Sequence, residues 1–284
     1  MTGGNILLYL LLAILSSALI SIIMRLSTDR VKGKRSMLAA NYLTCLVIAA
    51  LFTGPNNLFP SDADLLPTLG MGIIHGILYL LSFLLFQWCV EKNGVVLPAI
   101  FMKLGLLVPL VVSVAAFREI PTLLQVIGFV LAVAAIILIN LEKDASAKKA
   151  GVGLILLLLI GGAADAMSKV YEEIGAAARS EQFLFYTFLT AFLCCAAVVA
   201  LRREKIGKNE VLFGFLIGIP NFFSARFLLM ALTKLHAVIV YPTYSVATIL
   251  AVTLAGVILF KERLNRRQKI ALVIILAALI LLNL

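Results

Sequence analysis

Charged residues are scarce in this chain. Of its 284 residues only 13% are Asp, Glu, Lys or Arg, while 63% are hydrophobic. A soluble domain carries about 25% charged and about 45–50% apolar residues, so this scarcity excludes an ordinary soluble domain. A helix of about 20 apolar residues crosses the bilayer core, and the chain has ten such apolar runs. The runs do not alternate like barrel strands, so we predict an all-α polytopic membrane protein.

Residues typical of metal and redox sites are also rare. There are two histidines, which are isolated from each other, and four cysteines inside apolar runs with no CxxC spacing. The cysteines are interpreted as small buried apolar residues. No HExxH or paired-aspartate motif occurs, so we predict no catalytic residue, no metal site and no cofactor. An intramembrane enzyme acting on lipid and a non-transporting membrane scaffold are kept as remote alternatives.

The N-terminal stretch lacks a basic residue ahead of its apolar run, so we expect no cleaved signal peptide. The net charge of +10 could indicate a nucleic-acid partner. Membrane loops, however, carry an excess of Lys and Arg on their cytoplasmic side. We therefore expect a lipid bilayer and a small-molecule substrate as partners, and no nucleic acid; the sequence gives no oligomeric state.

One stretch of the chain occurs twice. Residues 117–141 and 260–284 align without a gap, and Glu119 falls on Glu262 while Gln125 falls on Gln268. Apolar matches between two membrane helices mean little, but an acid and a glutamine just ahead of an apolar run carry a signal. The second half therefore repeats the first at an offset of about 143 residues. GxxxG pairs, which let helices approach closely, recur at a similar offset: Gly72/Gly76 and Gly214/Gly218.

Each repeat holds five predicted helices. Because five is odd, the second copy enters the membrane from the opposite side, and a two-fold axis in the membrane plane relates the halves. We predict ten transmembrane helices in two inverted five-helix repeats, residues 1–143 and 144–284, forming one structural unit. The predicted helices are 5–27, 36–53, 67–90, 95–117, 121–141, 151–170, 182–201, 211–233, 237–260 and 268–283.

The turn pattern of an acid, five residues, a glutamine, a small residue and an apolar helix resembles the EamA-like family of the drug/metabolite transporter superfamily. The likeness covers essentially the whole chain, and Pro109, ten residues before Glu119, also fits it. Two departures stand out: Arg118 and Lys261 occupy positions where the family usually has Gly, and Val252 replaces Pro109 in the second repeat. The resemblance implies a small-metabolite carrier, with export as the family expectation; it does not specify the substrate.

The loops differ from the habit of that family. Sixteen Lys or Arg residues fall in one set of turns and only three in the other. The positive-inside rule then places the basic turns in the cytoplasm and both termini outside, whereas family members generally keep both termini inside. We follow the charges and expect a multi-pass protein of the plasma (inner) membrane. The basic set is Arg30, Lys32, Lys34, Arg35, Lys92, Lys143, Lys148, Lys149, Arg202, Arg203, Lys205, Lys208, Lys261, Arg263, Arg266 and Arg267.

Four ionisable residues lie inside predicted spanning helices: His75, Lys103, Asp165 and Arg226. Such groups cost a few kcal/mol on insertion scales, so each is a functional hypothesis. Helical rise places all four in one slab around and just beyond the midplane. Lys103 has no acid one turn away and aligns with Val246 in the other repeat, which favours a substrate-specific role; snorkelling or pairing with a distant acid is the alternative.

The other three also have structural alternatives. Arg226 either binds substrate or forms a salt bridge to Asp165. Asp165 and Lys169, four residues apart on one helix face, form either a structural ion pair or a site that couples transport to protons. His75 is either a site residue or a hydrogen-bonded packing residue.

Polar stripes on apolar helices predict the lining of a cavity. His75 begins a stripe along one face of the third helix, and a second stripe follows Pro242 on the ninth helix. We predict that the substrate-binding set is Lys103, Arg226, His75, Tyr79, Tyr244, Ser245, Thr248 and Asn41.

The charges of the slab indicate the substrate class. Lys103 and Arg226 against Asp165 give a sum of about +1 with His75 neutral. An excess of buried cation favours a carboxylate-bearing metabolite, such as an amino or organic acid. Efflux of cationic or lipophilic drugs, which would favour an excess of acid, is the alternative. We expect a secondary transporter that alternates access around a midplane cavity, and the family resemblance implies that it works as an exporter.

Overall fold

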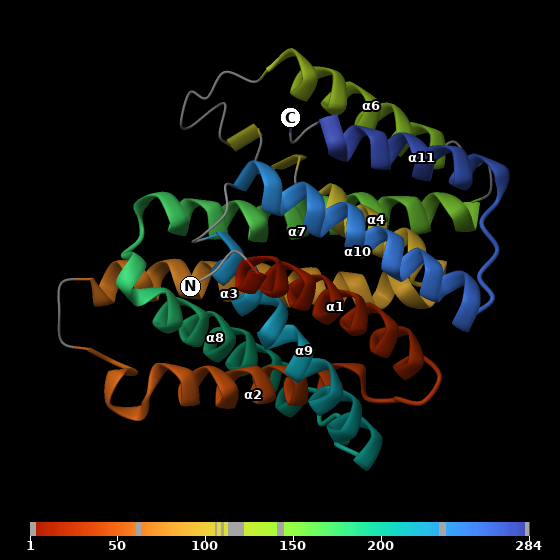
Figure 1. The fold of residues 1–284 in the computed structure, drawn as a ribbon. Coiled ribbons are helices and arrows are strands. Elements are labelled where there is room, and N and C mark those ends of the chain that lie inside the picture. Colours follow the sequence, from red (N-terminus) through yellow and green to blue (C-terminus); the bar gives the residue numbers. More distant parts are fainter. Residues whose placement is uncertain are drawn as a thin grey trace.

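The computed structural model describes residues 4–60, 64–105, 107–108, 111–112, 122–140, 145–232, 237–281 and 284. These residues form ten α-helices and two short 3-10 helices, with no strand among them (Figure 1). The all-α class and the ten-helix count are confirmed. The α-helices are α1 (Gly4–Ser27), α2 (Lys34–Thr53), α3 (Leu65–Asn93), α4 (Val96–Leu104), α6 (Leu123–Asn140), α7 (Ala145–Ile174), α8 (Ser180–Leu201), α9 (Lys208–Leu232), α10 (Ala237–Leu259) and α11 (Arg266–Leu281).

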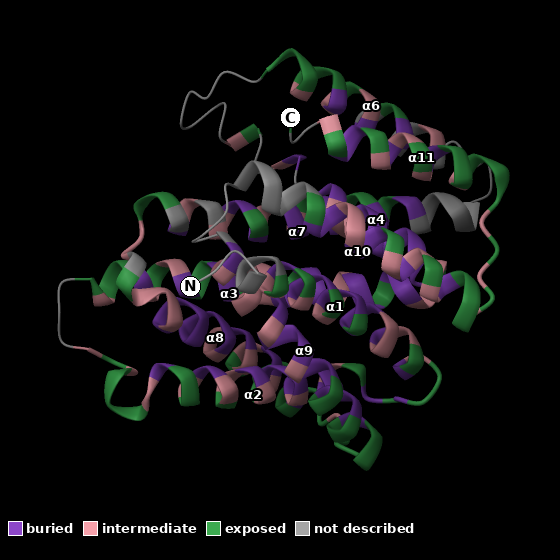
Figure 2. Cartoon of the chain, in the orientation of Figure 1, coloured by how far each residue is buried: buried purple, intermediate pink, exposed green. Residues whose placement is uncertain are grey.

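Helix is the form that these apolar runs require, because lipid leaves the backbone no partner outside its own segment. By length and composition, six of the described helices can cross a membrane: α1, α2, α3, α7, α8 and α9. Shorter apolar stretches lie in α6 and α10. Figure 2 shows that buried residues gather where helices face one another, while exposed positions mark the outward faces.

The packing of the helices is two-fold. Helix α1 packs on α9 as α7 packs on α3, and α2 packs on α9 as α8 packs on α3. Helix α4 contacts α7 as α10 contacts α1, and the pairs α2–α8, α4–α10 and α6–α11 each join equivalent helices. Exchanging the halves leaves this pattern unchanged, as a self-complementary two-fold interface requires. With five described α-helices in each half, the repeats are inverted, as predicted.

The GxxxG pairs occupy equivalent contacts of the two repeats. A Cβ built on Gly76 of α3 would lie 2.5 Å from the carbonyl oxygen of Thr187 on α8. A Cβ built on Gly218 of α9 would lie 2.7 Å from the carbonyl oxygen of Asn41 on α2. Each glycine face therefore lets the third helix of one repeat touch the backbone of the second helix of the other.

The repeated glutamines begin the last helix of each half. The Gln125 Oε1 atom accepts from the backbone N–H of Thr122 at 2.9 Å, and the Thr122 hydroxyl oxygen accepts from the Gln125 N–H at 3.2 Å. Asn265 and Gln268 make the same reciprocal pair at 3.0 and 2.8 Å. These are capping boxes, which satisfy free donors at a helix start. The glutamine of the motif therefore has a structural role.

The basic turns gather at one end of the bundle. The α1–α2 and α10–α11 turns lie at the right of Figure 1 and the α8–α9 turn at its lower right, while the turns after α2 and α7 lie at the left, at the other end. The charge bias found in the sequence is therefore a difference between the two ends of the molecule.

The glycine contact gives a first prediction. We expect Gly76→Ala to lower the unfolding temperature, because its Cβ would force backbones apart, and overpacking costs about 1–3 kcal/mol. Gly70→Ala on the same helix is the matched control, since a Cβ there meets nothing within 4 Å. The control is expected to be neutral or slightly stabilising, because Ala favours helix over Gly by about 1 kcal/mol. Thermal unfolding in detergent measures both; equal shifts would contradict the contact.

Candidate functional site

A cavity of about 160 Å³ lies between the two repeats. Helices α1, α3 and α4 of the first repeat and α7, α8, α9 and α10 of the second contribute its walls. Lys103, His75, Tyr79, Asp165, Tyr244, Ser245 and Thr248 all line it. The structure thus brings together seven of the ten residues that the sequence singled out.

Lys103 stands in the last turn of α4, at a break in that helix. Helix α4 ends at Leu104, and most of the remainder of the predicted helix 95–117 lies outside the described residues. Just after this end the backbone of Gly105 approaches that of Gly162: a Cβ on Gly105 would lie 2.9 Å from the Gly162 nitrogen. The helix end favours a cation nearby. The Lys103 ammonium lies 3.8 Å from the ring centroid of Tyr244, which is a cation–π contact.

Asp165 of α7 lines the same cavity. Asp165 is exposed to the cavity, and its carboxylate interacts electrostatically with Lys103. Yet no ion pair within 4.0 Å joins the two, and Asp165 has no hydrogen-bond partner among the described residues. The side chain of Lys169, its predicted partner, lies outside the described residues. Lys103 and Asp165 therefore face the same cavity without forming a direct ion pair.

His75 is held at both ring nitrogens. The Thr187 hydroxyl donates to the Phe183 carbonyl at 2.8 Å, so its oxygen is left to accept from Nδ1–H of His75 at 3.1 Å. Nε2 then accepts from the Ser168 hydroxyl at 3.2 Å. The His75 ring also stacks on Phe183, with centroids 5.1 Å apart and planes 6° from parallel. His75 is thus both a hydrogen-bonded packing residue and part of the wall.

Tyr79 connects the cavity to a fully buried pair of asparagines. Its hydroxyl donates to Asn221 Oδ1 at 2.7 Å, and Asn221 Nδ2 donates to Asn41 Oδ1 at 3.2 Å. Asn41 was predicted to bind substrate, but it is buried behind this chain of hydrogen bonds and is not part of the lining. The reason is that a buried amide needs partners, and Asn221 of α9, the helix of the other repeat that packs on α2, supplies one.

Arg226 lies apart from the cavity lining. Its Nε and Nη2 atoms donate to Glu181 Oε1 at 3.1 and 3.0 Å, and its guanidinium lies 3.7 Å from the ring centroid of Phe52. The structure therefore pairs Arg226 with Glu181 and not with Asp165. The partner sits at the start of α8, 45 residues away in sequence, where spacing gives no signal.

Sequence reasoning missed several hydroxyls of the lining. Ser224 lies within 3.1 Å of the Tyr244 hydroxyl, and Ser168 holds His75. Serines are common in membrane helices and often bond their own backbone, so single ones carry little signal. Among the described residues, no group of three or more His, Cys, Asp or Glu could hold a metal ion. The serines of the lining are Ser17, Ser21, Ser82, Ser168, Ser224 and Ser245.

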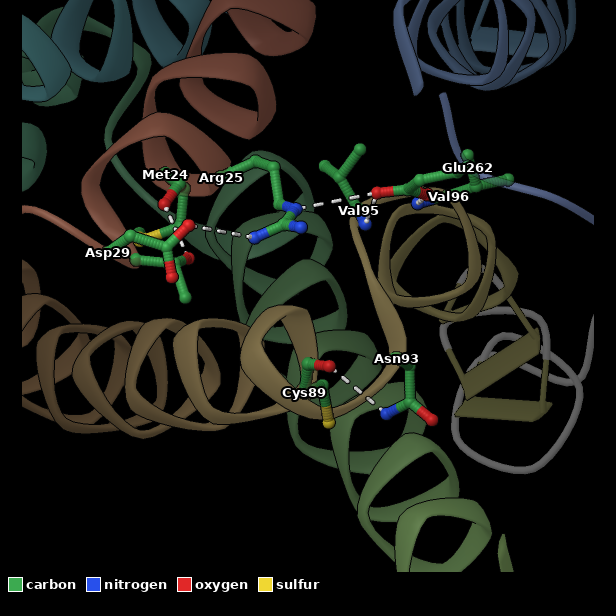
Figure 3. A network of polar contacts seen from close by, with 9 residues as sticks. Met24, Arg25, Asp29, Cys89, Asn93, Val95, Val96 and Glu262 are labelled. Atoms are coloured by element: carbon green, nitrogen blue, oxygen red, sulfur yellow. Dashed lines mark hydrogen bonds and ion pairs between the residues drawn. The ribbon is translucent and has the colours of Figure 1, made fainter. Parts of the chain in front are cut away.

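The helix that carries Lys103 is held at its start by the other repeat. Glu262, in the turn before α11, accepts from the backbone N–H groups of Val95 at 2.8 Å and Val96 at 3.3 Å (Figure 3). Arg25 Nε of α1 lies 3.6 Å from the same carboxylate. Gly94, which has a φ of 73°, leaves room for the Glu262 carboxylate, because a Cβ at this position would lie 2.6 Å from it. The acid of the repeated motif thus positions α4; its counterpart Glu119 lies outside the described residues.

Comparisons with known proteins agree with this architecture. The model of the EamA-like transporter family matches residues 4–141 and again residues 150–284. A curated Haemophilus influenzae (strain Rd) protein, described as uncharacterized, is 24% identical over 279 residues, covering 95% of each chain. A solved crystal structure of a protein superposes with a TM-score of 0.66 at 13% identity, covering 99% of this chain and 96% of that one. At that identity, the superposition shows a shared fold.

The cap on α4 gives a second prediction. We expect Glu262→Ala to lower the unfolding temperature, because it removes the acceptor for two N–H groups at a helix start, a loss of about 1–2 kcal/mol. Asp29→Ala is the matched control: it removes another acid near Arg25, but that side chain is 88% exposed and 4.0 Å away. Thermal unfolding in detergent compares them, and an equal effect of the two substitutions would refute the cap.

Proposed function

This chain belongs to the EamA-like transporter family, and we propose that it is a secondary transporter which moves a small zwitterionic metabolite, such as an amino acid, through the cavity between its repeats. The family match makes it a multi-pass membrane protein and is consistent with a carrier that is not an enzyme. Inverted repeats with a site between them are the general plan of carriers that alternate access.

The proposed substrate class rests on one observation. Lys103 and Asp165 line the same cavity, and no ion pair within 4.0 Å joins them. A charge inside a membrane protein is costly unless an opposite charge or water meets it. A ligand with both a carboxylate and an ammonium neutralises both groups at once. The sum of about +1 expected from sequence included Arg226, which is already paired with Glu181, so a zwitterion fits better than a simple anion.

The remaining walls suit an amphiphilic molecule. Phe83, Phe86 and Phe183 supply aromatic surface, and the serine hydroxyls and the Tyr79 and Tyr244 side chains supply polar contacts. Small-molecule sites are mostly apolar with a few placed polar groups. Such a lining accommodates a side chain of the metabolite beside its charged head.

The third prediction tests the two charges. We expect Lys103→Met and Asp165→Asn each to weaken counterflow of the transported amino acid in proteoliposomes by roughly tenfold to a hundredfold, because a charged contact contributes about 1.5–3 kcal/mol. Unfolding temperatures should not fall, since both groups lack an ion-pair partner within 4.0 Å among the described residues.

Lys92→Met is the matched control for the loss of a positive charge, because Lys92 is exposed at the basic end of α3. It should leave counterflow unchanged. If Lys103→Met transports normally while Asp165→Asn fails, the cavity selects cations, and the proposal gives way to efflux of cationic drugs. Normal counterflow in both variants would remove the zwitterion proposal.

The orientation is a further part of the proposal: the protein is an exporter of the plasma (inner) membrane with its basic turns in the cytoplasm and both termini outside. The support is the gathering of basic turns at one end of the bundle, following the positive-inside rule.

The fourth prediction tests orientation in a background without Cys45, Cys89, Cys194 and Cys195. Lys205→Cys, exposed at the basic end, should resist an impermeant thiol reagent in intact cells. Asn56→Cys, exposed at the opposite end, should react readily. The reverse labelling pattern would restore the usual orientation of the family.

A further inference from the structure

A second cavity, of about 730 Å³, lies at the basic end of the bundle and is separate from the central one. Lys32, Lys34 and Arg35 enter it from the turn before α2 and from the start of that helix, and Arg202 enters it from the end of α8. The first three belong to one repeat and the last to the other. The cavity is therefore built where the repeats meet at the end of the membrane-spanning bundle.

Its charges are only partly compensated. Lys34 pairs with Glu91, and Arg35 pairs with Glu204 at 3.3 Å. Lys32 and Arg202 also line the cavity and are exposed, and among the described residues neither side chain has a carboxylate partner. Two positive charges thus remain available to a ligand.

An apolar stripe leads away from these charges. Leu84 and Trp88 of α3 line the cavity, and Leu81 lies one turn further along the same face, at spacings of three and seven residues. Leu81 and Trp88 are 41% and 40% exposed. Trp88 is seated on α7, where a Cβ on Gly153 would lie 2.1 Å from its ring. A tryptophan at the end of a spanning helix is typical of the level of lipid headgroups.

We propose that this cavity binds the headgroup of an anionic phospholipid. The phosphate meets Lys32 and Arg202, and an acyl chain lies along Trp88, Leu84 and Leu81 toward the middle of the bilayer. Basic pockets between transmembrane helices on the cytoplasmic side are suited to anionic headgroups. A soluble anion would contact only the basic residues. A lipid would also contact the continuous apolar stripe through its acyl chain.

Trp88 is the single tryptophan of the chain, so its fluorescence reports on this cavity directly. The test reconstitutes the full chain in phosphatidylcholine vesicles and adds brominated phosphatidylglycerol or brominated phosphatidylcholine, whose bromines quench nearby tryptophan. We expect phosphatidylglycerol to quench Trp88 at about tenfold lower mole fraction. In the Lys32→Gln/Arg202→Gln double variant that preference should be lost, since each basic residue contributes about tenfold or less.

The matched control is Arg266→Gln/Arg267→Gln, which removes the same charge from exposed positions at the same end, away from the cavity. It should keep the preference, and unfolding temperatures check that both variants are folded. The proposal is overturned if wild type is quenched equally by both lipids, if both double variants lose the preference equally, or if glycerol 1-phosphate abolishes it; the last would assign the cavity to a free phosphate.

Discussion

The close contact of helix backbones across the two repeats is the constraint on which the rest of this structure depends. Gly72 and Gly76 set α3 against α8, and Gly214 and Gly218 set α9 against α2. Between lipid-exposed helices apolar burial gives little drive, so association depends on close packing and interhelical hydrogen bonds. These contacts fix the faces that α3 and α9 turn inward. His75, Tyr79 and Ser224 consequently face one cavity.

The scaffold is repeated, but the site is not. The glycine pairs, the capping boxes and the order of contacts occur in both halves. Lys103 instead aligns with Val246, and Asp165 contributes from the second repeat alone. Structural demands are the same on both halves, since each must pack on the other. A ligand that lacks two-fold symmetry would impose no such demand, so the lining of a ligand cavity is free to differ between the two halves.

Much of the site could be predicted because ionisable and aromatic polar residues are conspicuous in apolar helices. Lys103, Asp165, His75 and Tyr79 were identified in this way, since a buried charge or ring needs a reason to be there. Arg226 and Asn41 were predicted on the same grounds. Their partners, Glu181 and Asn221, lie on other helices, so the sequence does not reveal that they are already paired. Pairing of that kind depends on tertiary packing. The close approach of Gly105 to Gly162 of α7 likewise depends on tertiary packing.

The hydrogen bonds around His75 have a consequence for proton movement. The Ser168 hydroxyl has two acceptors within reach, Nε2 of His75 at 3.2 Å and the Ala164 carbonyl at 3.4 Å. If the imidazole gains a proton at Nε2, the Ser168 hydroxyl can rotate so that it donates to the Ala164 carbonyl. Its oxygen then accepts from Nε2–H of His75. Both forms of the ring therefore keep a complete set of partners, and the wall of the cavity can change charge without repacking.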